Sequence, residues 1–333
     1  MSGRPPRLVR HPDAAALVAR RSKLLAALRT WLDARNFLEA DVPPLAPHAG
    51  QEPHLRAPRV TLDGLPGPLF LQTSPELALK RLVCAGVPRV YALGFAFRGG
   101  RDELSTQHQP QFTMLEWYRP GTRVEELVED VAGLVGAAAA ALGVAAPAPP
   151  RVLTLREAFA ELAGLDLAPL LDGDVRSFST SARRAGVDGA CDDDDAPTAF
   201  GRALVARVEP SLTRLPGLVC LRDWPAFGAA LARLSPQDLR VALRVEAYLG
   251  GVELANGYVE LADPDEHRCR WREDAARRDD PAPPWDEGLL ADLAEPGLPE
   301  CVGMALGVDR LLMALLGARR LTDVLPLALD PGV

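Results

Sequence analysis

An arginine stands where an apolar strand, flanked by glycines, passes into an amphipathic helix near the end of the chain. Residues 303–310 form this junction, and Arg310 falls in the first turn of the helix. The helix dipole disfavours a cation at this end by about 0.3–1 kcal/mol at exposed positions. An arginine there suggests a bound anion, held by the guanidinium together with the N–H groups of the first turn. The alternative is that Asp309 caps the helix and pairs with Arg310, with no ligand involved.

A second arginine ends another apolar strand. Residues 97–118 read as a strand ending at Arg98, a polar loop, and a second strand that begins near Phe112. A guanidinium at a strand end can hold a phosphate through two parallel hydrogen bonds, and an aromatic ring can stack on a nucleotide base. The alternative is an ordinary hairpin with a charged tip.

Two glutamates flank an Asn-Gly pair. Asn256-Gly257 lies between strand-like runs, which is a strong signal for a two-residue hairpin turn. Such a hairpin places Glu253 directly opposite Glu260, and like charges in that arrangement destabilise a sheet. A divalent cation or an ammonium group between them would turn the repulsion into a binding site. The alternative is a pair of solvated carboxylates that point away from each other.

Ser74 and Glu76 lie where a strand ends and a helix begins. Ser74 suits the N-cap with Pro75 at the first helical position, and Glu76 favours the positive end of the helix. A glutamate beside a pocket can also receive a substrate amine, and the local sequence does not decide between these roles. Residues 263–266 fit a capping box, so the helix that begins there is predicted to be structural.

Clustered strands and helices must position these side chains. Apolar patterns predict helices over about 12–34, 75–85 and 124–142 and from 309, and strands at 68–72, 90–97, 111–118, 218–221, 245–254 and 303–306. Because the strands do not alternate strictly with helices, an α+β fold with an antiparallel sheet flanked by helices is favoured over a doubly wound parallel sheet. We predict a single domain over 1–333 with a smaller helical insertion at about 143–215.

The composition is that of an ordinary globular protein, with 48% hydrophobic and 25% charged residues. The net charge of −8 disfavours a broad nucleic-acid-binding surface, because phosphate binding needs clustered cations. The five cysteines form no CxxC pair, which argues against a disulfide framework or a zinc site. No signal peptide and no apolar run long enough to span a bilayer is visible, so we expect a cytoplasmic protein.

In this order and spacing, the segments resemble class II aminoacyl-tRNA synthetases of the lysyl type. Residues 97–118 are similar to motif 2 of that family, 303–310 to motif 3, and 37–47, less specifically, to the dimer-forming motif 1. The resemblance is strongest to the truncated paralogue family that ligates (R)-β-lysine to elongation factor P. The pattern begins within about twenty residues of Met1, which leaves no room for an N-terminal anticodon-binding domain. Ala305 also stands where synthetases usually have glycine and the paralogue has alanine.

The resemblance implies a ligase that uses ATP and Mg²⁺ to activate a lysine-like diamino acid as an acyl-adenylate. The acyl group would pass to a lysine of elongation factor P and not to tRNA, and the chain would act as a homodimer. Carried over by position, Arg98 and Arg310 are the catalytic residues and grip the ATP phosphates. Further ATP contacts are expected from Gly100, Gln109, Phe112, Glu253, Leu254 and Gly307. Contacts to the diamino acid are expected from Ser74, Glu76, Tyr118, Glu260 and Ala305, and Mg²⁺ ligands from Glu253 and Glu260.

Motif 2 departs from the family pattern. Gly100 stands where the family has glutamate, and the loop after it is about two residues longer, so that Asp102 or Glu103 is a candidate replacement. Gln109 replaces the usual asparagine. These departures leave two alternatives open. One is an adenylate-forming paralogue with a carrier protein or an RNA as acceptor, and the other is a regulatory module that binds an amino acid or a nucleotide without turnover.

Overall fold

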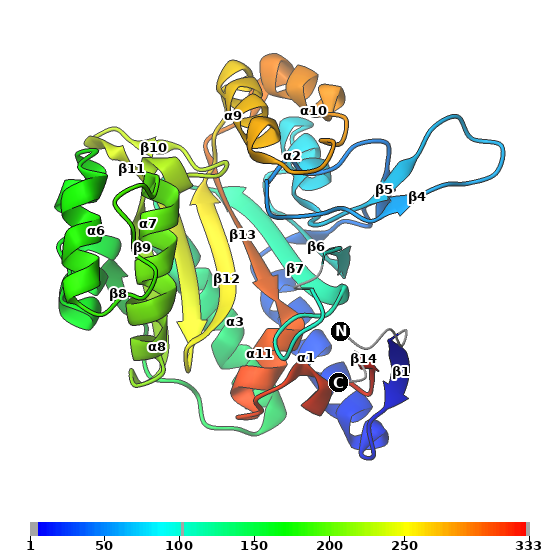
Figure 1. The fold of residues 1–333 in the computed structure, drawn as a ribbon. Coiled ribbons are helices and arrows are strands. Elements are labelled where there is room, and N and C mark those ends of the chain that lie inside the picture. Colours follow the sequence, from blue (N-terminus) through cyan, green and yellow to red (C-terminus); the bar gives the residue numbers. More distant parts are fainter. Residues whose placement is uncertain (1–5, 101–102, 331–333) are drawn as a thin grey trace. The chain divides into compact units, whose positions relative to one another are not determined.

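A computed structural model describes residues 6–100 and 103–330 of the chain (Figure 1). The backbone contacts divide these residues into two compact units. Unit 1 comprises residues 6–100, 103–120, 133–146 and 261–330, and unit 2 comprises 121–132 and 147–260. Within the described residues, no helix has both the length and the apolar character needed to cross a membrane.

The main sheet of unit 1 is predominantly antiparallel. It contains, in spatial order, β2 (Leu38–Glu39), β6 (Val90–Phe97), β7 (Gln111–Pro120) and β13 (Cys301–Gly307). β2 runs parallel to β6, whereas the β6–β7 and β7–β13 pairs are antiparallel. The register sets Ala92, Glu116 and Ala305 side by side across three strands. Residues directly opposite one another point to the same face of a sheet, so these three side chains share one surface.

Helices and short strands complete unit 1. Its helices are α1 (Ala14–Asp33), α2 (Glu76–Cys84), α9 (Pro264–Arg277), α10 (Glu287–Asp292), α11 (Val308–Leu315) and the second half of α3 (Glu125–Leu142). Its short strands are β1 (Arg7–Arg10) paired with β14 (Leu327–Asp330), and β5 (Leu69–Leu71) between β3 (Leu45–Ala46) and β4 (Arg59–Val60). α10 packs against both α2 and α9, as Figure 1 shows. Asp263 caps α9 as predicted, because its side chain accepts hydrogen bonds from the N–H groups of Asp265 and Glu266.

Unit 2 combines a sheet with a group of short helices. Its strands are β8 (Arg151–Thr154), β9 (Leu218–Pro225), β10 (Leu234–Ser235), β11 (Asp238–Leu249) and β12 (Val252–Val259). Its helices are α4 (Leu155–Ala158), α5 (Ala168–Leu171), α6 (Val175–Arg184), α7 (Ala196–Ala203) and α8 (Glu209–Leu212). Buried aromatic rings from helices and sheet meet in one core, where the Phe200 ring lies 5.3 Å from Phe159 and 5.7 Å from Trp224. The helices fall within the predicted segment 143–215, which also contains β8.

The hairpin predicted at Asn256-Gly257 is wrong, because both residues lie inside strand β12. The chain turns instead at Gly250-Gly251, where Leu249 pairs with Val252 across a two-residue loop. Both glycines have positive φ, 60° and 81°, as the twist-matched type I′ turn requires, and glycine adopts this conformation without strain. The predicted strand at 245–254 is therefore two strands.

Candidate active site

A buried carboxylate organises the sheet face of unit 1. Glu116, on β7, is only 2% exposed and accepts hydrogen bonds from the hydroxyls of Ser74 and, at 2.7 Å, Tyr118. Ala305 lies directly opposite Glu116 on β13. Three of the residues predicted to contact the diamino acid, Ser74, Tyr118 and Ala305, therefore gather around Glu116. Sequence reasoning missed Glu116 itself, although a glutamate among apolar strand residues, two positions before Tyr118, was the available signal.

Glu76 begins α2 beside this face. Its carboxylate accepts a hydrogen bond from Nζ of Lys80 at 2.6 Å, and the Lys80 side chain is fully buried. A buried ammonium needs such a partner, so the pair has a structural role within α2. The predicted N-cap is displaced by one residue. Pro75 takes that position, while the Ser74 hydroxyl accepts from the N–H of Glu76 at 3.1 Å.

Arg98 follows directly on β6. Its backbone N–H donates to the Pro110 carbonyl at 2.9 Å, and its guanidinium carbon lies 5.1 Å from the centroid of the Phe112 ring. The buried Nε of Arg98 has no hydrogen-bond partner among the described residues. A guanidinium held against an aromatic face in this way can still offer its N–H groups to an anion. The structure thus brings together the predicted phosphate ligand Arg98 and the predicted base-stacking ring Phe112.

Arg310 lies in the first turn of α11, after Gly307 at the N-cap. Its guanidinium contacts the loop that precedes β7: Nε donates to the Gln107 carbonyl at 3.3 Å, and Nη2 lies 2.7 Å from Nε2 of His108. Both arginines predicted to grip phosphates therefore reach the same loop of unit 1.

Asp309 does not cap α11, and it pairs with Arg21 and not with Arg310, so the roles that the alternative gave to Asp309 are wrong. Its buried carboxylate accepts hydrogen bonds from Nη1 of Arg21 and, at 2.8 Å, from the N–H of Thr113. Arg21 also donates to the Thr113 hydroxyl. Asp309 thus fastens α11 to α1 and β7, which holds the adjacent Arg310 in place.

The backbone at Gly100 does not suit the glutamate that the family has at this position. Gly100 has φ +131°, a conformation that other residues rarely adopt, so a glutamate there would be strained. The Cγ of Glu103 lies 3.7 Å from the position that a Cβ at residue 100 would take. Asp102, the other candidate replacement, lies outside the described residues. Gln109 anchors the loop, since its side-chain amide exchanges two hydrogen bonds with the backbone of Leu329, at 3.1 and 3.0 Å.

Unit 2 holds a second group of acids on the β11–β12 hairpin. Glu246 is 5% exposed, pairs with Arg244 at 2.6 Å and accepts a hydrogen bond from the Tyr248 hydroxyl. Burial raises the pKa of Glu246 to about 7; Arg244 opposes this rise, and the charge of Glu253 adds to it. Glu253 pairs in register with Tyr248. Glu246 and Glu253 are therefore the neighbouring carboxylates of this hairpin.

Glu260 is not the partner of Glu253. It follows β12, is buried, and forms a bridge with Ala232. Six residues of extended chain lie between the two glutamates, which places them roughly 23 Å apart, so the opposed pair predicted from the sequence does not form. Leu254, also on β12, is buried. Across the described ranges, no cluster of three or more His, Cys, Asp or Glu side chains could hold a metal ion by itself.

Comparison with known proteins agrees with these features. The family model for class II tRNA synthetases (D, K and N) matches residues 4–330. The elongation factor P–(R)-β-lysine ligase of Pectobacterium carotovorum is 37% identical over 325 residues, which cover 95% of each chain. The ligases of the same name from Vibrio campbellii and Klebsiella pneumoniae are 36% identical over 314 residues and 35% identical over 320 residues, covering 91% and 93% of this chain and 93% and 94% of theirs. The predicted class II α+β fold is confirmed, and the chain belongs to the class II tRNA synthetase family, among the elongation factor P–(R)-β-lysine ligases.

Proposed function

We propose that this chain activates (R)-β-lysine, or a closely related diamino acid, with ATP and transfers it to a lysine of elongation factor P. The observation that carries the proposal is the likeness to named ligases along nearly the whole chain. The gathering of Ser74, Tyr118 and Ala305 around Glu116 supports it. A carboxylate with two hydroxyls beside it suits a substrate that carries ammonium groups.

In the first step, a carboxylate oxygen of the diamino acid attacks the α-phosphorus of ATP. The bond from that phosphorus to the bridging oxygen breaks, pyrophosphate leaves, and an acyl-adenylate forms. We assign Arg98 and Arg310 to the phosphates and Phe112 to the adenine, because Arg98 lies against the Phe112 ring and Arg310 contacts the loop that leads into the same strand. Fixed cations stabilise the charge that develops on the phosphate oxygens.

In the second step, the amine of an acceptor lysine attacks the acyl carbonyl. The bond from the acyl carbon to the AMP oxygen breaks, AMP leaves, and the amine loses a proton, which gives an amide. A protein acceptor suits a chain with a net charge of −8 better than tRNA does, since RNA recognition generally uses basic surfaces. We place the reaction in the cytoplasm, in agreement with the lack of a spanning helix in the described residues.

For Mg²⁺ we propose Glu246 and Glu253 in place of the pair Glu253 and Glu260. Their mutual repulsion fits a cation site, and Mg²⁺ is commonly held by one or two carboxylates plus substrate phosphates. When bound, the ion would neutralise phosphate charge. Glu260 stays in the proposal as a contact for the diamino acid.

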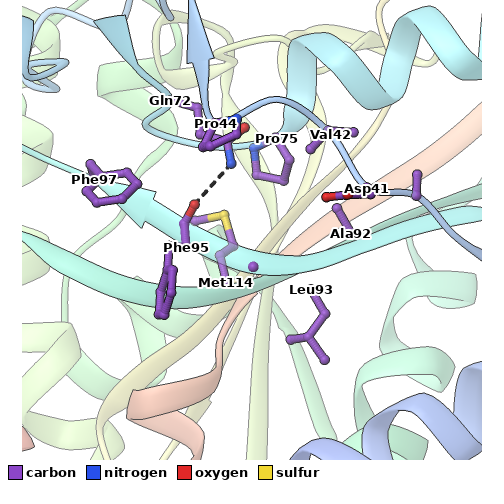
Figure 2. Close-up of a pocket in the computed structure, with 12 residues that line it drawn as sticks. Asp41, Val42, Pro44, Gln72, Pro75, Ala92, Leu93, Phe95, Phe97 and Met114 are labelled. Atoms are coloured by element: carbon purple, nitrogen blue, oxygen red, sulfur yellow. Dashed lines mark hydrogen bonds between the residues drawn. The ribbon is translucent and has the colours of Figure 1, made fainter. Parts of the chain in front are cut away.

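We further propose that the chain is a homodimer through unit 1. An apolar pocket of about 250 Å³ lies between β6 and residues 40–44, a part of the segment that resembles motif 1 (Figure 2). The Gln72 amide crosses it to donate to the Phe95 carbonyl at 3.0 Å. Phe95 is 54% and Leu38 60% exposed, so a second copy would cover apolar surface. Light scattering of Phe95→Glu should show monomers; a wild-type chain that is already a monomer at micromolar concentration would contradict this proposal.

The test of function is direct transfer. Enzyme, ATP, Mg²⁺ and (R)-β-lysine are incubated with elongation factor P and, separately, with total tRNA. Intact-mass spectrometry should show the factor heavier by one β-lysyl group, and acid gels should show uncharged tRNA. Charged tRNA with an unmodified factor would favour a minimal synthetase. Adenylate formation without transfer would indicate another carrier, and the absence of any adenylate would favour a binding module without turnover.

A further inference from the structure

A glutamate outside the residues considered so far is held with one carboxylate oxygen unsatisfied inside unit 1. Oε2 of Glu52 is inaccessible to solvent and has no hydrogen-bond partner among the described residues. Burial raises the pKa of Glu52 and the charge of Glu76 adds to this, whereas its own backbone N–H and the charge of Arg98 act in the opposite direction. A buried acceptor without a donor costs about 1–3 kcal/mol.

The loop that carries Glu52 is fastened from several sides. The buried Arg278 guanidinium donates to the carbonyls of Glu52 and Leu55 at 2.8 and 3.2 Å. The Gln51 amide donates to the carbonyls of Ala49 and Pro283 at 2.8 and 3.2 Å. These bonds tie the loop to the segment after α9 and fix the position of the carboxylate.

Glu52 lies at the predicted amino-acid site. A Cβ at Gly50 would collide with Oε2 of Glu52 and would lie 3.3 Å from the hydroxyl of Thr73, the residue before Ser74. The carboxylate and the Thr73 hydroxyl therefore lie together in front of the Gly50 α-carbon. The charges of Glu76 and Arg98 both act on the pKa of Glu52, so both residues lie near it. Arg98 is the residue assigned above to the phosphate that the substrate carboxylate attacks.

We propose that Glu52 binds the substrate ammonium group closest to the reacting carboxylate. This inference rests on the function proposed above. Glu76 is already paired with Lys80, and Arg98 would turn its charge to the nucleotide, so the Glu52 carboxylate would have no hydrogen-bonded cation of its own. An ammonium group brings one positive charge and three N–H donors, enough for Oε2 of Glu52 and the Thr73 hydroxyl together. Glu52 would thereby select for the presence and position of that amine.

The test compares ligands that lack one ammonium group each. Pyrophosphate exchange gives KM for lysine and (R)-β-lysine, and inhibition constants for norleucine, which lacks the distal ammonium, and for 6-aminohexanoate, which lacks the proximal one. Glu52→Gln should weaken binding of lysine, (R)-β-lysine and norleucine at least tenfold, and should change 6-aminohexanoate less than twofold. Glu52→Asp should recover part of the loss.

Two further variants separate recognition from folding. Gly50→Ala should displace the Glu52 carboxylate and reproduce the Glu52→Gln pattern, because the collision is with the flexible end of that side chain. Glu129→Gln, on an exposed face of α3, removes the same charge and should change nothing. The melting temperature of Glu52→Gln should equal or exceed that of the wild type. If the Glu52 carboxylate served only to stabilise the fold, its loss would lower the melting temperature.

Two outcomes would overturn the assignment: unchanged binding of lysine by Glu52→Gln, or equal weakening of lysine and 6-aminohexanoate. If the wild-type chain activates none of the diamino acids, the proposed function itself fails, and that result is distinct from either of these.

Discussion

Two adjacent residues should respond to alanine substitution in opposite ways. Asp309 is 3% exposed and joins Arg21 of α1 to the Thr113 N–H of β7. Breaking a buried ion pair costs about 3–5 kcal/mol, because the remaining charge is left uncompensated. Arg310 is partly exposed, and its contacts to Gln107 and His108 join a loop rather than a core. Losing them should cost about 1 kcal/mol.

For pyrophosphate exchange, the direct effect should come from Arg310 and not from Asp309. Removing a cation that stabilises phosphate charge lowers the rate of such reactions by about 10²–10³-fold. Arg310→Ala should therefore keep its fold and lose pyrophosphate exchange. The melting temperature of Asp309→Ala should be several degrees below that of the wild type, and that of Asp309→Asn should lie between the two. Thermal melts and exchange assays on the same preparations decide the matter. If Arg310→Ala keeps exchange within threefold of wild type, or melts at a temperature as low as that of Asp309→Ala, Arg310 is not a phosphate ligand with a minor role in stability.

Three further predictions concern carboxylates. Glu253→Gln should weaken Mg²⁺-dependent ATP binding about tenfold in calorimetric titration and should raise the melting temperature, since it relieves repulsion on Glu246; unchanged metal dependence would remove this pair as the Mg²⁺ site. Glu246 has a pKa raised to about 7, so the folded chain holds its proton more tightly than the unfolded chain does, and the free energy of unfolding should fall between about pH 4.5 and pH 7. Urea denaturation should show this fall in the wild type and a flatter profile in Glu246→Gln, and parallel profiles would contradict it. Glu103→Ala should raise KM for ATP about tenfold without raising KM for the diamino acid, whereas unchanged KM for ATP would show that Glu103 does not replace the motif 2 glutamate.

Local patterns predicted most elements because their signals lie within a few residues. Leu17, Leu24, Leu28 and Leu32 recur at helical spacing, and they are the buried residues of α1. The hairpin of unit 2 shows where such signals compete. Asn256-Gly257 and Gly250-Gly251 both have the composition of a hairpin turn. The turn at Gly250-Gly251 is the one consistent with the pairing of β11 along its length with β12 and β9.

The site was harder to predict where it depends on contacts that are distant in sequence. Asp309 pairs with Arg21, 288 positions away, and no spacing rule indicates that contact. Glu116 needed the register that brings Ala305 opposite it and the turn that brings Ser74 to it. Glu52 lies in a loop whose position is fixed by Arg278, so its burial is visible only in the folded chain.

The loop that carries His108 also depends on the last described strand. Gln109 binds the backbone of Leu329, Thr106 accepts a hydrogen bond from the Leu321 N–H, and β14 pairs with β1 at the other end of the chain. On the ribosome, β1 therefore has no partner until residues near Asp330 have emerged from the exit tunnel. A nascent chain that stops short of β14 can complete much of its core and still lack the anchor of this loop. On the function proposed above, a chain that ends before β14 should therefore bind ATP more weakly than the chain that includes β14.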